Sequence, residues 1–154
     1  MTFDIRNATT ADARTIADNN NRLAEETEAR SLDPELIGPG VEAIIADLSK
    51  GRYWVAVAGD KIVGQIAVTY EWSDWRNGMM WWISSVYVNS DHRRRGVYSS
   101  LYRHVESQAK SDPEVIGIRL YVEKENKKAQ ETYKKLGMDM TKYRIMETLI
   151  VRDK

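Results

Sequence analysis

The stretch "SDHRRRGVYSSLY", residues 90–102, decides the fold, because a strand ends before it and a helix begins within it. The preceding run, "MMWWISSVYVN" at 79–89, is rich in aromatic and β-branched residues and predicts a long strand. After Gly96 an apolar residue recurs every four positions, which predicts a helix. These residues are Val97, Leu101, Val105 and Ala109. Backbone N–H groups and the positive end of a helix then converge at the loop, an arrangement that favours an anion such as phosphate.

The three arginines at 93–95 leave three interpretations open: a solvated turn, a phosphate cradle, or a nucleic-acid patch. The 154 residues contain 23 basic and 23 acidic side chains, so the net charge is zero. No global field therefore draws the chain to nucleic acid or to an anionic membrane. Gly96 lets the backbone approach a ligand closely, and arginine side chains pair with phosphate oxygens in fork-shaped hydrogen bonds.

Several classes of protein are disfavoured by the composition. The chain has no cysteine, which excludes a disulfide framework, a thiolate metal site and a cysteine nucleophile. No apolar run approaches the roughly 20 residues that span a bilayer. The first residues, "MTFDIRNATTADA", do not resemble a signal peptide. We therefore expect a cytoplasmic protein.

Working outward, the rest of the sequence predicts alternating helices and strands. Residues 2–8 read as a strand, 9–30 as a helix, and 33–50 as a second helix, with a break at "GPG", residues 38–40, left open as the alternative. Residues 52–72 read as a hairpin around Gly59 and Asp60, and "SDWRNG" begins a second hairpin. Residues 114–123 predict a strand, 126–136 a helix, and "MDMTKYRIMETLIV" at 138–151 one or two further strands. This order indicates a mixed α/β domain around one sheet.

A second group of residues follows about thirty positions after the loop. Asn126, Ala129 and Tyr133 share one face of the predicted helix, with the small alanine between an amide and a phenol. Considered alone, Asn126 would be the N-cap of this helix, and Tyr133 would be a half-buried core residue. Their position after the basic loop and the intervening strand favours a functional interpretation of the group.

The two segments resemble motifs of the GNAT acetyltransferase superfamily. "RRRGVY" at 93–98 is similar to its R-x-x-G-x-G/A loop, except that Tyr98 stands where a small residue is usual. "NKKAQETYKKLGM" at 126–138 is similar to its N-x-x-A-x-x-x-Y-x-x-x-G-F segment, with Met138 in place of phenylalanine. The element order fits over essentially the whole chain. The resemblance implies one GNAT domain over residues 1–154, an α/β fold with a central mixed, mostly antiparallel sheet of six to seven strands and about four helices.

The resemblance also implies an acetyl-CoA-dependent N-acetyltransferase, with acetyl-CoA as cosubstrate and no metal. The pyrophosphate is expected at the amides of the loop and the helix start, namely Arg93, Arg94, Arg95, Gly96, Val97, Tyr98 and Ser99. The pantetheine arm is expected along Val86, Tyr87 and Val88, where Asn126 would also touch it. Tyr133 would act as general acid for the departing thiolate. Homodimers are common in this family.

A general base is harder to select. Glu71 is our first choice, because it ends a strand beside the tryptophans at 72, 75, 81 and 82, although an exposed strand-end charge is the alternative interpretation. Asp74 and the carboxylates of Glu25, Glu26 and Glu28 are the other candidates. An aromatic wall with carboxylates favours a cationic acceptor, so we expect a small primary amine.

Other functions remain open at this point. The absence of cysteine favours direct transfer in a ternary complex with acetyl-CoA. The acceptor can instead be a protein N-terminus or a lysine. A non-catalytic acyl-CoA sensor would keep the loop and Asn126 without a base, and a nucleic-acid module would use "HRRRG" at 92–96.

Overall fold

The structure, a computed structural model, describes residues 2–151. The chain divides into two compact units, Met1–Tyr121 and Val122–Lys154. The first unit contains β1 (Asp4–Asn7), η1 (Thr10–Asp12), α1 (Ala13–Glu28), α2 (Pro34–Ala46), β2 (Arg52–Ala58), β3 (Lys61–Ser73), β4 (Gly78–Val88), η2 (Ser90–His92), α3 (Val97–Ser111) and β5 (Val115–Leu120). The second unit contains α4 (Lys127–Lys135). The single domain expected over residues 1–154 stays a prediction.

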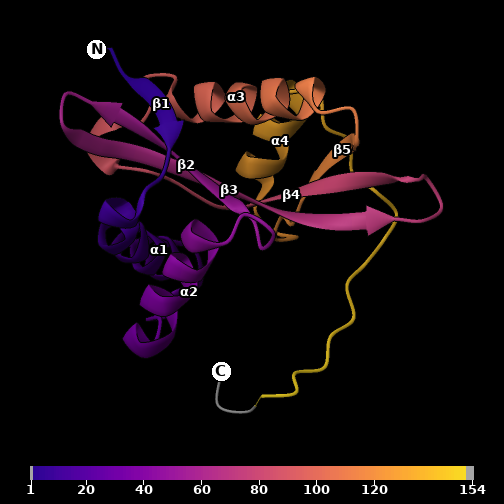
Figure 1. Cartoon of the computed structure of the whole chain (residues 1–154), viewed down its shortest axis with the longest axis horizontal. Coiled ribbons are helices and arrows are strands. Elements are labelled where there is room, and N and C mark those ends of the chain that lie inside the picture. Colours follow the sequence, from indigo (N-terminus) through magenta and orange to yellow (C-terminus); the bar gives the residue numbers. More distant parts are fainter. Residues whose placement is uncertain (1, 152–154) are drawn as a thin grey trace. The chain divides into compact units, whose positions relative to one another are not determined.

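The first unit is built on one sheet with the strand order β1-β2-β3-β4-β5 (Figure 1). The first four strands pair antiparallel with their neighbours, and β5 pairs parallel with β4. The predicted α/β class and the mixed, mostly antiparallel sheet are therefore confirmed. The parallel pair is joined through α3, as a crossover connection requires.

The expected count of six to seven strands is wrong, because the described residues form five. The missing strands were predicted at 138–151, where no strand is present. The prediction rested on apolar and β-branched residues alone, and a strand also needs a neighbouring backbone to accept and donate its hydrogen bonds.

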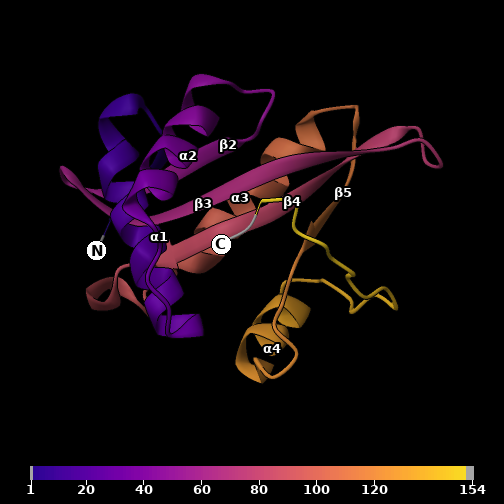
Figure 2. The same ribbon diagram turned by 90° about the horizontal axis from the view of Figure 1, so that it is seen from below.

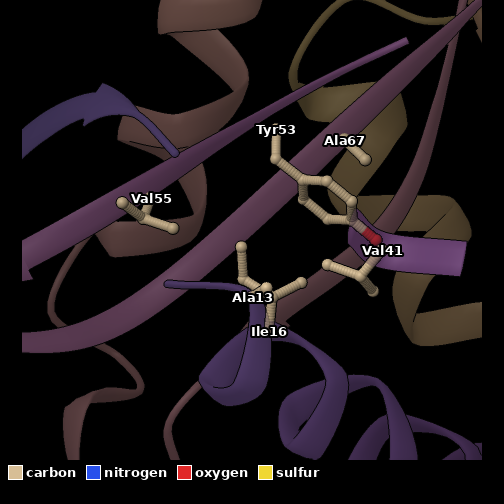
Figure 3. Close-up of a cluster of buried hydrophobic side chains, with 6 residues drawn as sticks. All are labelled: Ala13, Ile16, Val41, Tyr53, Val55 and Ala67. Atoms are coloured by element: carbon tan, nitrogen blue, oxygen red, sulfur yellow. The ribbon is translucent and has the colours of Figure 1, made fainter. Parts of the chain in front are cut away.

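Helices cover both faces of the sheet in the first unit. Figures 1 and 2 show α1 and α2 on one face and α3 on the other. Under α1 and α2, six buried side chains form one cluster (Figure 3). They are Ala13, Ile16, Val41, Tyr53, Val55 and Ala67. None of the helices in residues 2–151 is long and apolar enough to cross a membrane.

The helix α3 packs closely on β3. The four residues predicted from the four-residue repeat, Val97, Leu101, Val105 and Ala109, are all buried. A Cβ atom at Gly64 would lie 2.8 Å from Cγ1 of Val97 and 3.2 Å from Cδ1 of Leu101. Glycine at this position therefore allows the first turn of α3 to approach the sheet, and this contact fixes where the preceding loop ends.

The second helix is continuous through "GPG", so the alternative of a break there is wrong. The helix α2 begins after Asp33, whose side chain accepts a hydrogen bond of 2.9 Å from the backbone of Glu35, and it continues through "GPG" to Ala46. Pro39 removes one donor from the helix ladder. The apolar face that buries Val41 compensates for this loss through packing.

Candidate functional site

The loop between β4 and α3 has the left-handed backbone that the single glycine suggested. Arg94 has a φ of 63° and Gly96, the N-cap of α3, has a φ of 81°. Ser100 donates the first helical hydrogen bond, to the carbonyl of Gly96, over 3.0 Å. The N–H groups of the residues between them point out of the helix end without an intrahelical acceptor. This end of α3 can therefore receive an anion at Val97, Tyr98 and Ser99.

Arg93 holds the loop against the rest of the first unit. Its Nε donates to the carbonyl of Val88 over 3.0 Å, and its terminal nitrogen donates to the Glu26 carboxylate over 2.9 Å. Its guanidinium also lies 5.4 Å from the ring centre of Tyr87. Arg93 is thus engaged within the protein through its side chain.

Glu26 joins the same contact from α1. A hydrogen bond from the Tyr87 hydroxyl, together with the hydrogen bond and charge of Arg93, lowers the pKa of the Glu26 carboxyl. Burial and the neighbouring Glu26 raise the pKa of Tyr87. The carboxylate and the neutral phenol therefore persist together at neutral pH. The ion pair of Arg93 and Glu26, which are 67 positions apart in the sequence, thus ties the loop to β4 and to α1.

β4 carries a bulge just before this loop. Gln65 of β3 pairs with Tyr87 and Ala67 pairs with Ser84, so two residues of β4 lie opposite one residue of β3. One of the two, Ser85, has a φ of 51°. Bulges bend a strand and re-aim its backbone groups, and they are frequent beside active sites.

β4 also extends past its neighbour β5. The parallel pairing runs from Met79 and Val115 to Ile83 and Leu120, where β5 ends. Residues 84–88 of β4 continue beyond it, and in the described residues their outer edge is paired with no strand. The backbone groups of this stretch that point away from β3 thus lie on an edge that leads directly into the loop, where the Val88 carbonyl already accepts from Arg93. An extended ligand could bind here as an additional strand would.

A network of buried, hydrogen-bonded polar side chains holds the bulge in place. Gln65, with 0% of its surface exposed, donates to the carbonyl of Ser85 over 3.2 Å and to the side chain of Asn20 over 2.9 Å. Asn19 donates to Gln65 over 3.1 Å, and Asn20 donates to the Tyr53 hydroxyl over 3.0 Å. Since buried polar groups are costly unless they are hydrogen-bonded, this network fixes the bulge to α1 and β2.

Sequence reasoning missed this network. A visible signal was present, because Gln65 interrupts the apolar run "IVGQIAV" at 62–68 in a strand that is otherwise buried. Its partners Asn19 and Asn20 lie more than forty residues away. Only the fold shows that they meet.

The hairpin end of β4 carries a second polar group, which includes Glu71. The Glu71 carboxylate accepts from Nε1 of Trp82 over 3.0 Å and from Arg119 over 3.3 Å. Tyr121 stacks on Trp82 with ring centres 4.5 Å apart. We call Glu71, Trp82, Arg119 and Tyr121 the hairpin cluster. Arg119 and Tyr121 were not selected from the sequence, because an alternating strand gave no sign of their partners.

Glu71 is not next to the bulge. It pairs with Met80, six residues before Val86, a separation of about 20 Å at the usual rise of a strand. Of the four tryptophans expected around it, Trp82 contacts it, Trp72 is exposed, Trp75 is exposed at the hairpin turn, and Trp81 is buried on the face that carries Trp54. The predicted aromatic wall is therefore divided between the core and the surface.

The second unit carries the two remaining site residues. The side-chain oxygen of Asn126 accepts from the backbone N–H of Ala129 over 3.1 Å and so caps α4. Tyr133 lies seven residues further along this helix, on the same face. Burial raises the pKa of the Tyr133 phenol to about 12. Tyr133 is therefore protonated at neutral pH, as a proton donor must be.

Histidines and metal ligands contribute little to these features. His104 packs edge-on against Trp54, and burial lowers its pKa. Within residues 2–151, no group of three or more histidine, aspartate or glutamate side chains is arranged to hold a metal ion.

The comparisons with known proteins agree with this geometry. The model of the acetyltransferase (GNAT) family matches residues 17–138. A solved structure described as a possible acetyltransferase from Clostridium difficile 630 is 43% identical, with a TM-score of 0.92, and the match covers 99% of this chain and 100% of that one. No curated protein matches the sequence.

Two more distant structures share the fold. A predicted acetyltransferase with acetyl-CoA from Clostridium acetobutylicum is 17% identical, with a TM-score of 0.79 and 97% of each chain covered. A glucosamine-6-phosphate N-acetyltransferase from Arabidopsis thaliana is 23% identical, with a TM-score of 0.74 and 96% and 99% covered. With the family model matched over most of the sequence, the chain belongs to the GNAT acetyltransferase family.

Proposed function

We propose that the protein is an acetyl-CoA-dependent N-acetyltransferase whose acceptor is a small primary amine. The observation that carries this proposal is the continuous open path from the outer edge of β4 at residues 84–88 to the left-handed loop at Arg94 and Gly96. Backbone groups along the first part suit the amides of a pantetheine arm, and the end of α3 suits a pyrophosphate. The solved structure from Clostridium acetobutylicum contains acetyl-CoA, which supports the choice of cosubstrate.

The residues proposed to bind acetyl-CoA follow this path. Val86, Tyr87 and Val88 would bind pantetheine through backbone groups, and Arg93 to Ser99 would bind the pyrophosphate through N–H groups. Because the Arg93 side chain is engaged with Val88 and Glu26, we assign it a positioning role there. Asn126 would contact the pantetheine arm through its side-chain NH2, since its oxygen already caps α4.

The proposed reaction is a direct transfer. The lone pair of a neutral amine attacks the thioester carbonyl, the C–S bond breaks, and the nitrogen loses a proton while the thiolate gains one. Tyr133 supplies the second proton, because its raised pKa keeps the phenol neutral until the thiolate forms. Glu71 stays the predicted base, and its separation from the bulge means that it would take the first proton through water.

The acceptor follows from the hairpin cluster. Half of the Glu71 side chain is exposed, and its negative charge would attract a cationic amine, with the edge of the Trp82 ring beside it. The Arabidopsis thaliana protein is named for N-acetyl transfer to a small amino sugar phosphate, which supports a small acceptor. A primary amine of low molecular weight is therefore the proposed acceptor class.

The experiment that tests the function follows thiol release from acetyl-CoA with a panel of polyamines, amino acids, amino sugars and peptides. We expect acetylation of at least one small amine, detected as a mass increase of one acetyl group. Transfer only to peptides would move the acceptor to protein N-termini or lysines. Binding of acetyl-CoA without transfer to any member would favour the non-catalytic sensor.

Tyr133→Phe tests the proton donor. We expect kcat to fall by about 10² to 10⁴, the usual contribution of general acid catalysis, with little change in acetyl-CoA affinity. The pKa of about 12 also predicts that the wild-type rate shows no loss assigned to this phenol as the pH rises to about 10. Tyr70→Phe is the matched control, since burial also raises the pKa of Tyr70 in the first unit. Equal kcat for both variants would remove Tyr133 from the mechanism.

A further inference from the structure

Gln65 places a buried amide in the middle of an apolar strand. It has 0% of its surface exposed, and the part of β3 around it is buried as well. Its Nε2 donates to the Asn20 side chain and to the Ser85 carbonyl, and its Oε1 accepts from Asn19. Both N–H donors of the amide are therefore in use, and its orientation is fixed from more than one direction.

Stability alone does not account for this arrangement of amides. Burying a polar group is unfavourable, and apolar side chains of the same shape can replace a hydrogen-bonded set with little loss of stability. An apolar side chain cannot, however, donate to a backbone carbonyl. Among the three partners of Gln65, Ser85 contributes a backbone atom, and it lies in the bulge of β4. The network therefore acts on the direction of this peptide.

Ser85 has a backbone conformation that needs support. Its φ of 51° lies in the left-handed region, which is unfavourable for a residue other than glycine. Such a conformation persists only where the surrounding contacts hold it, and it is frequent at functional sites. The hydrogen bond of 3.2 Å from Gln65 is a contact of this kind.

The same hydrogen bond determines the direction of the next N–H group. The described residues contain no cis peptide bond, so the Ser85 carbonyl and the Val86 N–H point in opposite directions across one planar unit. Gln65 lies on the face of the sheet that α1 covers, because its partners Asn19 and Asn20 belong to α1. The Ser85 carbonyl is turned toward this interior, and the Val86 N–H is therefore turned away from it.

We propose that Gln65 is a positioning residue for acetyl-CoA: by holding the Ser85 carbonyl, it fixes the direction of the Val86 N–H that the cosubstrate would meet. Asn19 and Asn20 hold the Gln65 amide in turn. Gln65 itself would touch neither the cosubstrate nor the acceptor, because its side chain is completely buried. This inference rests on the proposed function, which sets acetyl-CoA along this part of β4.

The first test measures the direction of the Val86 N–H bond without any ligand. Residual dipolar couplings of a protein with isotope-labelled valine report the orientation of each valine N–H bond. Gln65→Met keeps the length of the side chain and removes its hydrogen bonds. We expect the Val86 coupling to change in this variant, whereas Val55 and Val105, which are buried in β2 and α3, keep their wild-type couplings. An unchanged Val86 coupling would overturn the proposal.

Tyr53→Phe is the matched control. It removes another buried hydrogen bond of the same network, the one of 3.0 Å from Asn20 to the Tyr53 hydroxyl, and none to the bulge. We expect the wild-type coupling for Val86 and the wild-type affinity for acetyl-CoA. If the Val86 coupling changed as much in this control as in Gln65→Met, any loss of a buried polar contact would loosen the bulge, and the specific role of Gln65 would be wrong.

The second test titrates acetyl-CoA into the wild type and both variants by calorimetry. We expect Gln65→Met to bind about tenfold more weakly than the wild type, the loss of one well-made hydrogen bond. Equal affinities of the wild type and Gln65→Met would refute this inference and leave the proposed function standing. A wild type that does not bind acetyl-CoA would refute the proposed function, and this inference with it.

Asn19→Ala keeps the experiment decisive if Gln65→Met does not fold. It retains Gln65 and its bond to Ser85 but removes the donor to Oε1, so the amide is less firmly oriented. We expect a smaller change of the Val86 coupling and about threefold weaker binding of acetyl-CoA, the loss of part of one hydrogen bond. Wild-type values for both quantities would contradict the proposal.

Discussion

The two ends of β4 use polar side chains in opposite ways. At the bulge end, Gln65 and its asparagine partners are buried and hold one backbone carbonyl in place. At the hairpin end, Glu71 and Arg119 are partly exposed and are bonded to each other and to Trp82. The difference indicates that the bulge end fixes a backbone path, which we propose for the cosubstrate, whereas the hairpin end presents partly exposed side chains.

Gln65→Leu should have the largest effect on stability. It removes three hydrogen bonds and leaves the Asn19 and Asn20 side chains and the Ser85 carbonyl without this partner inside the protein. At about 1 kcal/mol or more for each unsatisfied group, we expect a loss of about 3 kcal/mol in the free energy of unfolding, measured with urea. Gln108→Leu on α3 is the control and should change it by less than about 0.5 kcal/mol. Equal midpoints for both variants would show that the bulge is not held by this network.

Glu26→Gln should have a smaller, pH-dependent effect at the same end. Glu26 and Arg93 are both partly exposed, so their ion pair contributes up to about 1 kcal/mol. Because the folded-state pKa of Glu26 is lowered, this contribution is present above its unfolded pKa and is lost as the pH falls through the folded value. The difference in unfolding free energy between the wild type and the variant should therefore be seen at pH 7 and disappear in acid, once the pH is below the lowered folded-state pKa of Glu26. A difference that stays constant with pH would contradict the ionic contact.

Glu71→Gln should have the smallest effect on stability and a specific effect on the acceptor. The side chain is half exposed, so the free energy of unfolding should change by less than about 1 kcal/mol. For a cationic amine we expect kcat/KM to fall about tenfold or more, the loss of one charge-assisted interaction. Asp60→Asn, at an exposed carboxylate in the turn between β2 and β3, is the control. If Glu71→Gln destabilised the protein as much as Gln65→Leu does, the proposed difference between the two ends of β4 would be wrong.

The elements that depend only on residues close together in the sequence could be predicted. The four-residue repeat of α3, the hairpin turn at Gly59 and the cap at Asp33 all depend on neighbouring residues, and each was located correctly. The contacts that were missed join distant segments: Gln65 with Asn20, and Arg93 with Glu26. The wrong prediction of strands at 138–151 has the same origin, because β propensity describes a segment and strand pairing needs a second one.

The most direct test of the account is a calorimetric titration of acetyl-CoA into the wild type, Gly96→Ala and Gly59→Ala. Both glycines have a left-handed φ, 81° and 66°, and a Cβ at either position would meet open space. Each variant should therefore lose a similar stability, about 1 to 2 kcal/mol, from backbone strain alone. We predict that the wild type and Gly59→Ala bind one acetyl-CoA per chain with equal affinity and that Gly96→Ala binds at least tenfold more weakly. Equal binding by all three proteins, or no binding by the wild type, would contradict the placement of the cosubstrate at this loop.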